Sequence, residues 1–150
     1  MIMKQRQIKF RAVRKRLDSE VKEWVYGDLF RTTDKGDMAI QWWKDGLYNR
    51  VEVWNETIGQ YTGFEDAMER EIYEGDIVKI DGCPERGLLV VVFDEGSFAL
   101  ATPREYASLE KGVHPYLNDY ARLTPLGLFE LQGLYRIVGN VTENEELLED

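Results

Sequence analysis

The sequence has few of the side chains on which nucleophilic and metal chemistry depends. Its 150 residues include one cysteine and one histidine. Cys83 has no partner for an internal disulfide, which suits a reducing compartment. One cysteine and one histidine cannot supply the ~four nitrogen and sulfur ligands of a zinc site. Cys83 and His114 also fall in separate predicted loops, where they do not suggest a catalytic pair. We therefore expect a protein that is not an enzyme, with no cofactor and no metal.

Long apolar runs and nucleotide-binding motifs are also missing. The longest apolar run, residues 88–93, is far shorter than the ~20 residues of a membrane span. The N-terminus lacks the apolar region of a signal peptide, and neither a P-loop nor G-x-G-x-x-G occurs. Six acids between residues 65 and 76 lack the EF-hand order, so we interpret them as a solvated loop. These features predict a cytoplasmic protein with no membrane partner.

Basic side chains are fewer than acidic ones. The chain has 19 Lys and Arg against 28 Asp and Glu, a net charge of −9. This balance argues against a nucleic-acid-binding surface over most of the protein. Residues 1–16 hold seven bases and no acid, whereas residues 143–150 hold five acids. These two ends could form ion pairs within one chain or between subunits, or could lie in solvent.

Alternation of apolar and polar residues predicts a mainly β protein, which we interpret as one domain over residues 1–150. In residues 7–14 the alternation predicts an N-terminal strand with Lys9 and Arg11 on one exposed face. The same pattern predicts further strands at residues 24–30, 38–43, 47–54, 58–63, 72–80, 87–93, 98–101 and 133–141, of which 72–80 is entered through a glycine turn. We expect residues 71–101 and 133–141 to form the core as a small SH3-like barrel.

Helices are expected at two places only. Residues 102–105 read Thr-Pro-Arg-Glu, a capping box with proline at the first helical position. This motif predicts one inserted short helix from residue 103 to about residue 111, ending at Gly112. Residues 142–148 begin with a capping residue followed by acids, which predicts a short C-terminal helix. Residues 112–132 give no clear pattern.

Three groups of short motifs occur in a fixed order along the chain. They are IKFRA at residues 8–12, IGQYTGF at 58–64 with EIYEGDIV at 71–78, and IVGNV at 137–141 with NEELL at 144–148. Together they resemble the YopX family of bacteriophage and prophage proteins, over about residues 7–148. The resemblance implies a β-rich fold, a phage or prophage origin, a place in the bacterial cytoplasm and self-association. It implies no reaction and no catalytic residues.

The residues of these motifs are expected to have structural roles. The glycines suit strand ends or kinks, because a missing Cβ permits positive φ or a close backbone approach. The tyrosines offer a large apolar ring with one hydroxyl, and the aspartate can accept local backbone amides. The set comprises Gly59, Tyr61, Gly63, Tyr73, Gly75, Asp76, Gly139 and Asn140.

Two sets of residues are candidate interaction surfaces. The basic residues of the N-terminal segment could contact phosphates, or could instead pair with acids of this chain or of a neighbouring one. Trp42 and Trp43 are adjacent, so in a strand they face opposite ways and at least one is poorly buried. Exposed aromatic rings mark interfaces, although ordinary core packing is the alternative. The two sets are Lys9, Arg11, Arg14 and Arg16, and Trp42 with Trp43.

These observations favour a non-enzymatic phage or prophage protein that forms a homo-oligomer. It would act through protein–protein contacts, with a host or phage protein as a possible partner. One alternative is an acidic decoy or regulator that binds a host nucleic-acid-handling protein by presenting negative charge. Another is a nucleic-acid binder that uses the basic N-terminal strand, which the net charge disfavours.

Overall fold

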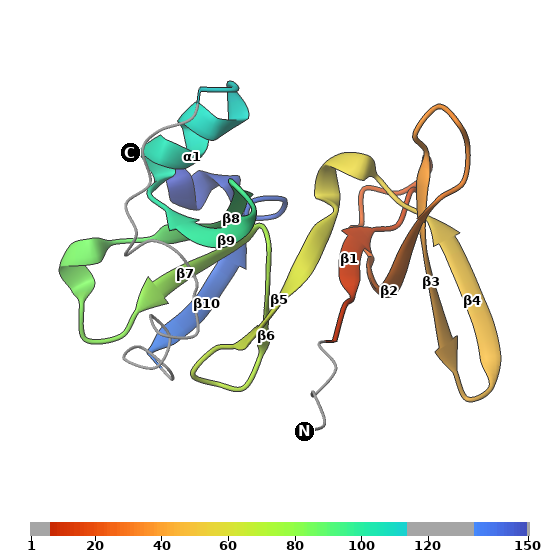
Figure 1. The fold of residues 1–150 in the computed structure, drawn as a ribbon, viewed down its shortest axis with the longest axis horizontal. Helices are drawn as coiled ribbons and strands as arrows, with labels where there is room; N and C mark the ends of the chain where they lie inside the picture. The colour runs from red at the N-terminus through yellow and green to blue at the C-terminus, as the bar shows by residue number, and fades with distance from the viewer. Residues whose placement is uncertain (1–6, 114–133, 150) are drawn as a thin grey trace. The chain divides into compact units, whose positions relative to one another are not determined.

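The computed structural model describes residues 7–113 and 134–149, and the chain forms two compact units, residues 1–63 and 64–150 (Figure 1). Strands dominate both units, so the prediction of a mainly β protein is confirmed. Two antiparallel sheets account for the strands, one of six strands and one of four.

The first unit consists of antiparallel strands in the order β4-β3-β2-β1-β5. β5 carries the chain into the second unit, and β6 follows it in the sheet order. The turn between β3 and β4 is Asp45-Gly46, with φ of 52° and 76°, as a tight two-residue hairpin requires. The elements are β1 (Phe10–Val13), β2 (Trp24–Arg31), β3 (Met38–Lys44), β4 (Leu47–Glu52), the 3-10 helix η1 (Asn55–Thr57) and β5 (Gly59–Glu65).

The core of the first unit takes one small or β-branched residue from each successive segment of the sheet. Ala12, Val25, Ile40 and Val53 are at most 5% exposed and contact one another. Near Val53 the sheet curls back toward its first strand: the Lys15 N–H donates to the Glu52 carbonyl at 2.8 Å. These contacts bury one face of the sheet. The opposite face carries other side chains, among them Trp43 and Tyr48.

The second unit contains the four-stranded sheet β10-β7-β8-β9. Val78 and Val91 belong to a core on one face, while Val90 and Val92 lie in a core on the other face, against which α1 packs. The elements are β6 (Glu71–Tyr73), β7 (Asp76–Ile80), η2 (Pro84–Arg86), β8 (Leu89–Asp94), β9 (Ser97–Ala101), α1 (Pro103–Glu110), β10 (Tyr135–Asn140) and η4 (Glu145–Leu148).

Several sequence-based expectations about the second unit can be judged directly. The capping box is confirmed, because the Glu105 N–H donates to Thr102 Oγ1 at 3.2 Å and the Thr102 N–H donates to Glu105 Oε1 at 3.0 Å. The expected C-terminal helix is a short 3-10 helix, residues 145–148. The glycine turn expected in residues 72–80 is confirmed at Gly75, where φ is 94°, and the residues before the turn form a separate short strand, β6.

The SH3-like barrel is not confirmed. In the described part of the chain, β10 and β9 are the end strands of an open four-stranded sheet, and no pairing joins them. Most apolar residues of β7 and β8 are nevertheless buried, because a cluster of apolar side chains lies on each face of that sheet. Residues 114–133, where the sequence gave no clear pattern, lie outside the described residues.

Candidate functional site

The β3–β4 hairpin ends in an exposed group of large apolar side chains. Trp43 lies opposite Tyr48 in the register, with ring centroids 5.3 Å apart, and the Tyr48 hydroxyl donates to Gln41 Oε1 at 2.7 Å. Trp43 and Leu47 are each 70% exposed and Tyr48 is 49% exposed. We call Trp43, Leu47 and Tyr48 the hairpin tip. Trp43 and Tyr48 share one face of the hairpin, whereas Leu47 lies on the other face beside the turn. Exposed large apolar side chains of this kind are typical of an interaction surface.

The two adjacent tryptophans have different environments. Trp42 packs against the core of the first unit, whereas Trp43 stands on the opposite face of β3. This agrees with the sequence-based argument that neighbouring residues of a strand face opposite ways and that one ring would be poorly buried. The alternation could not indicate which of the two rings would be exposed.

Two of the basic residues proposed as an interface are held by aromatic rings of the first unit. Lys9 Nζ lies 5.1 Å from the centre of the Tyr61 ring, and the Arg11 guanidinium lies 4.8 Å from that of Trp24. The expectation that Arg11 would be exposed was wrong, because only 8% of it is accessible. The face of β1 that carries Arg11 is shared with the aromatic side chains of β2, which cover it.

The other two basic residues contact an acid of the same chain. Arg14 lies 3.8 Å and Arg16 3.1 Å from the Glu23 carboxylate, and all three side chains are partly exposed. Exposed pairs of this kind contribute about 0–1 kcal/mol each, so they hold the segment only weakly. They do reduce the positive charge available to a phosphate ligand.

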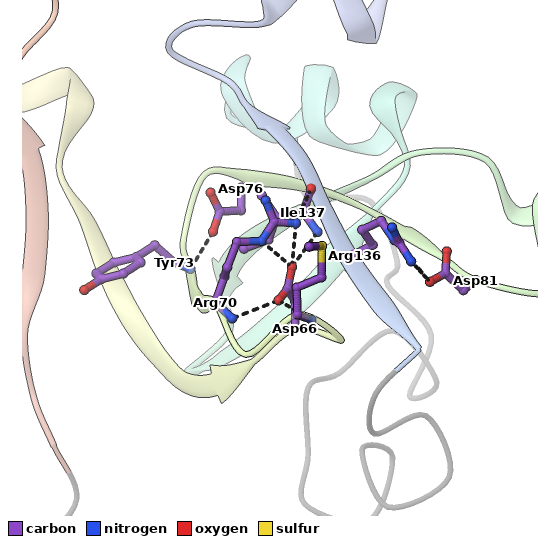
Figure 2. A network of polar contacts seen from close by, with 8 residues as sticks. Asp66, Arg70, Tyr73, Asp76, Asp81, Arg136 and Ile137 are labelled. Carbon is purple, nitrogen blue, oxygen red and sulfur yellow. Dashed lines mark hydrogen bonds and ion pairs between the residues drawn. The ribbon is translucent and has the colours of Figure 1, made fainter.

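The second unit contains a buried carboxylate that sequence reasoning placed in a solvated loop (Figure 2). The Asp66 side chain is fully buried and accepts hydrogen bonds from the backbone N–H groups of Met68 and Arg70, each at 2.9 Å, and of Ile137 at 3.1 Å. The Arg70 guanidinium lies 2.8 Å from the same carboxylate and also donates to the Ile137 carbonyl. The loop after β5 is therefore tied to β10.

The protonation of Asp66 follows from these contacts. Burial raises its pKa, but the backbone donors Arg70, Ile137 and Met68 and the Arg70 side chain together outweigh burial, so the pKa lies below its ordinary value. Asp66 therefore remains an anion in the neutral range. Its lone pairs point at protein donors, which is the arrangement of a structural anchor rather than of a general base.

The motif residues of the second unit surround turns. Asp76 accepts the Tyr73 N–H at 2.7 Å across the turn at Gly75. At the end of β10, Asn140 Oδ1 accepts the N–H groups of Thr142 and Glu143 at 3.0 and 2.9 Å. A Cβ on Gly139 would lie 2.6 Å from the Asn144 side chain. These contacts organise the local backbone around each turn.

The motif residues near β5 are also placed by the backbone. Gly59 is buried beside Arg11 of β1, and Tyr61 is buried two residues further on. Gly63 has φ of 89°, a conformation that other residues rarely adopt. None of the three brings an acid, a base or a nucleophile into a common site.

The side chains considered for metal and thiol chemistry lie apart from one another in the described residues. No group of three His, Cys, Asp or Glu side chains in them could hold a metal ion. Cys83 is half-buried beside a shallow pocket of about 430 Å³ between β7 and η2, and His114 lies outside the described residues. Among the described helices none is long and apolar enough to cross a membrane.

Comparison with known proteins bears on the fold and on the family of the chain. The chain resembles a solved structure titled "Crystal structure of protein EF1440 from Enterococcus faecalis", with a TM-score of 0.53 and 22% identity over 97% of this chain and 100% of that chain. At that identity the likeness concerns the fold alone. A search of curated proteins finds no match. The family model described as YopX protein matches residues 9–149, so the chain belongs to the YopX family.

Proposed function

We propose that this chain is a non-enzymatic, phage- or prophage-encoded cytoplasmic protein that self-assembles and acts through protein–protein contacts. The observation that carries the proposal is the hairpin tip, where Trp43 and Leu47 are each 70% exposed. A tryptophan gains more from burial at an interface than almost any other side chain, and interface centres are enriched in it.

The placement of the basic residues weighs against nucleic-acid binding. Arg11 is buried against Trp24, and Arg14 and Arg16 already contact Glu23. A net charge of −9 further disfavours a polyanion ligand. The family resemblance supports the phage or prophage origin and the bacterial cytoplasm as the place of action.

Size-exclusion chromatography with light scattering tests the proposal. We expect the wild-type protein at about 50 µM to elute as a defined multimer, because an exposed aromatic patch gains from being buried between copies. Trp43→Ser removes the largest ring of the hairpin tip and should shift the mass toward that of one chain.

Leu17→Ser is the matched control, because Leu17 is 90% exposed and lies outside every strand. This variant should keep the wild-type mass. A wild-type protein that remains a monomer at low and high salt would refute self-assembly and direct attention to the acidic-decoy alternative. An equal loss of mass in both variants would show that the hairpin tip has no special role.

A further inference from the structure

The outer edge of β4 carries main-chain groups with no strand beside them. β4 is the end strand of its sheet in the part of the chain that the structure describes. An open strand edge can pair with a strand of another chain, and proteins usually protect such edges. The edge lies directly beside the hairpin tip, since Leu47 and Tyr48 are the first two residues of β4.

The direction of each main-chain group follows from two hydrogen bonds at the end of β4. The Val53 N–H donates to the Met38 carbonyl of β3, whereas the Glu52 carbonyl accepts from the Lys15 N–H on the other side. Along a strand, successive residues direct their N–H and C=O groups to alternate sides. Tyr48 and Arg50 therefore share the outward direction of Glu52, and Asn49 points its main chain toward β3.

The side chains of the outward residues lie on the face away from the core. In the register, Tyr48 is opposite Trp43 and Arg50 is opposite Gln41, while Val51 pairs with the core residue Ile40. The Arg50 guanidinium lies 4.8 Å from the centre of the Phe30 ring on that same face. The open edge therefore presents one aromatic ring, that of Tyr48, and one cation, that of Arg50, two residues apart on the same face.

Only a few antiparallel registers let two copies of this edge pair with each other. Placing Arg50 opposite Arg50 of the second copy sets like charges against each other, which destabilises a cross-strand pair. The same register, and any that uses the Glu52 main chain, also needs a carbonyl that Lys15 already occupies. Placing Tyr48 opposite Tyr48 leaves Arg50 facing the turn. The remaining register places Asn49 opposite Asn49, and hence Tyr48 opposite Arg50. It sets the turn residue Gly46 of the second copy opposite Glu52, where the hairpin of that copy ends, so it needs no hydrogen bond from the Glu52 carbonyl.

We propose that β4 is a self-association site that pairs antiparallel with β4 of a second copy of this chain, about a twofold axis at Asn49. The proposal rests on the proposed function and names the surface through which assembly occurs. Tyr48 and Arg50 of each copy exchange main-chain hydrogen bonds with Arg50 and Tyr48 of the other. Each Arg50 guanidinium then meets the ring of the opposite Tyr48, a favourable cation–π pair that the symmetry repeats.

Disulfide trapping tests this register directly. Asn49→Cys is made in a Cys83→Ser background, which removes the single native thiol. In the proposed pair the two residues at position 49 form a non-hydrogen-bonded pair with Cα atoms about 4.5 Å apart, within the range a disulfide spans. Mild oxidation should convert most of this variant to a covalent dimer on non-reducing electrophoresis.

Leu47→Cys in the same background is the control. Leu47 would face Val51 of the second copy, so the two residues at position 47 would be separated by about 13 Å along the strands, too far for a disulfide. It should stay uncross-linked under the same conditions. Equal cross-linking of both variants, or of neither, would overturn the proposed register.

Changing the charges at positions 48 and 50 tests the same register by a second measurement, the strength of self-association. Tyr48→Arg sets two guanidinium groups against each other at both symmetric positions and should weaken self-association at least about tenfold. Tyr48→Arg combined with Arg50→Glu restores opposite charges, so association should return and become sensitive to salt. Leu17→Arg adds the same charge elsewhere and should change nothing.

The outcomes separate the two proposals. A wild-type multimer that neither cross-links at position 49 nor responds to Tyr48→Arg would overturn the β4 pairing while leaving self-assembly in place. A wild-type monomer in light scattering would overturn both. Far-ultraviolet circular dichroism of each variant shows whether a lost multimer reflects a lost contact or an unfolded chain.

Discussion

Replacing Asp66 by alanine removes the anchor that ties the loop after β5 to β10. The carboxylate is fully buried and accepts three backbone N–H groups, those of Met68, Arg70 and Ile137, besides contacting the Arg70 guanidinium. In the variant these donors lose their acceptor. A donor left unsatisfied costs about 1–3 kcal/mol when it is buried, and because these three hydrogen bonds are part-buried, the lower end of that range applies to each.

The expected loss of unfolding free energy is about 3–5 kcal/mol. The lower bound takes about 1 kcal/mol for each of the three backbone donors. The upper bound adds about 2 kcal/mol for the Arg70 guanidinium, which loses the carboxylate that it pairs with. A loss of this size is a large fraction of the ~5–15 kcal/mol that stabilises an ordinary domain. It corresponds to a fall in Tm of roughly 10 °C or more.

Urea denaturation of Asp66→Ala and Asp81→Ala makes a matched comparison. Asp81 also pairs with an arginine of β10, since Arg136 lies 3.0 Å away, but its side chain is 34% exposed. Solvent screens that pair, so its loss should cost less than about 1 kcal/mol. Equal unfolding midpoints for the two variants would refute the reasoning that burial and backbone donors make Asp66 the stronger anchor.

The same anchor should respond to acid. The pKa of Asp66 is lowered in the folded protein, so its stabilising contribution is complete above the unfolded pKa of about 4. The contribution is lost as the pH falls through the lower, folded value. The stability difference between wild type and Asp66→Ala should therefore be largest at neutral pH and shrink below about pH 4. A difference independent of pH would contradict an ionised anchor.

Three further substitutions test backbone features by urea denaturation. Gly27→Ala puts a Cβ against the backbone carbonyl of Gln41 and should cost about 2–4 kcal/mol, so an unchanged midpoint would contradict the close approach. Gly139→Ala brings a Cβ to 2.6 Å from Asn144 Oδ1 and should lower the unfolding free energy by about 1–3 kcal/mol. The same substitution should cost less in a chain that already carries Asn144→Ala, because the clashing side chain is gone. If the two substitutions lower the unfolding free energy additively, the clash is contradicted. Thr102→Ala removes the cap of α1 and should cost about 1 kcal/mol, whereas Thr102→Ser should cost almost nothing.

The strands could be predicted because each carries its own signal. Val90 and Val92 face one core and Leu89 and Val91 the other, so β8 reads as an unbroken apolar run. The capping box of α1 is equally local, since its donors and acceptors lie within four consecutive residues. Strands and helix caps can be predicted because they depend on residues that are close together in the sequence.

Features decided by distant residues could not be predicted. Asp66 is buried because Ile137, far along the chain, supplies a backbone donor, and the acidic surroundings of Asp66 suggested a solvated loop instead. Its spacing from Arg70 is the local signal that could have indicated a pair. The alternation placed Arg11 on the correct face of β1, but its burial depends on the rings that β2 brings to that face.

The division of the chain into two units has no signal in the sequence. No linker separates residues 1–63 from residues 64–150, and β5 runs across the boundary at Gly63. Glycine, proline and serine do not gather there, so composition gives no boundary. The interpretation of residues 1–150 as one domain stays a prediction.

The mass of the wild-type protein in solution tests the central claim most directly. Light scattering at about 50 µM should give a defined multimer, and Trp43→Ser should lower its mass toward that of one chain, because Trp43 is the most exposed ring of the hairpin tip. A wild-type protein with the mass of a single chain at every salt concentration would contradict the account.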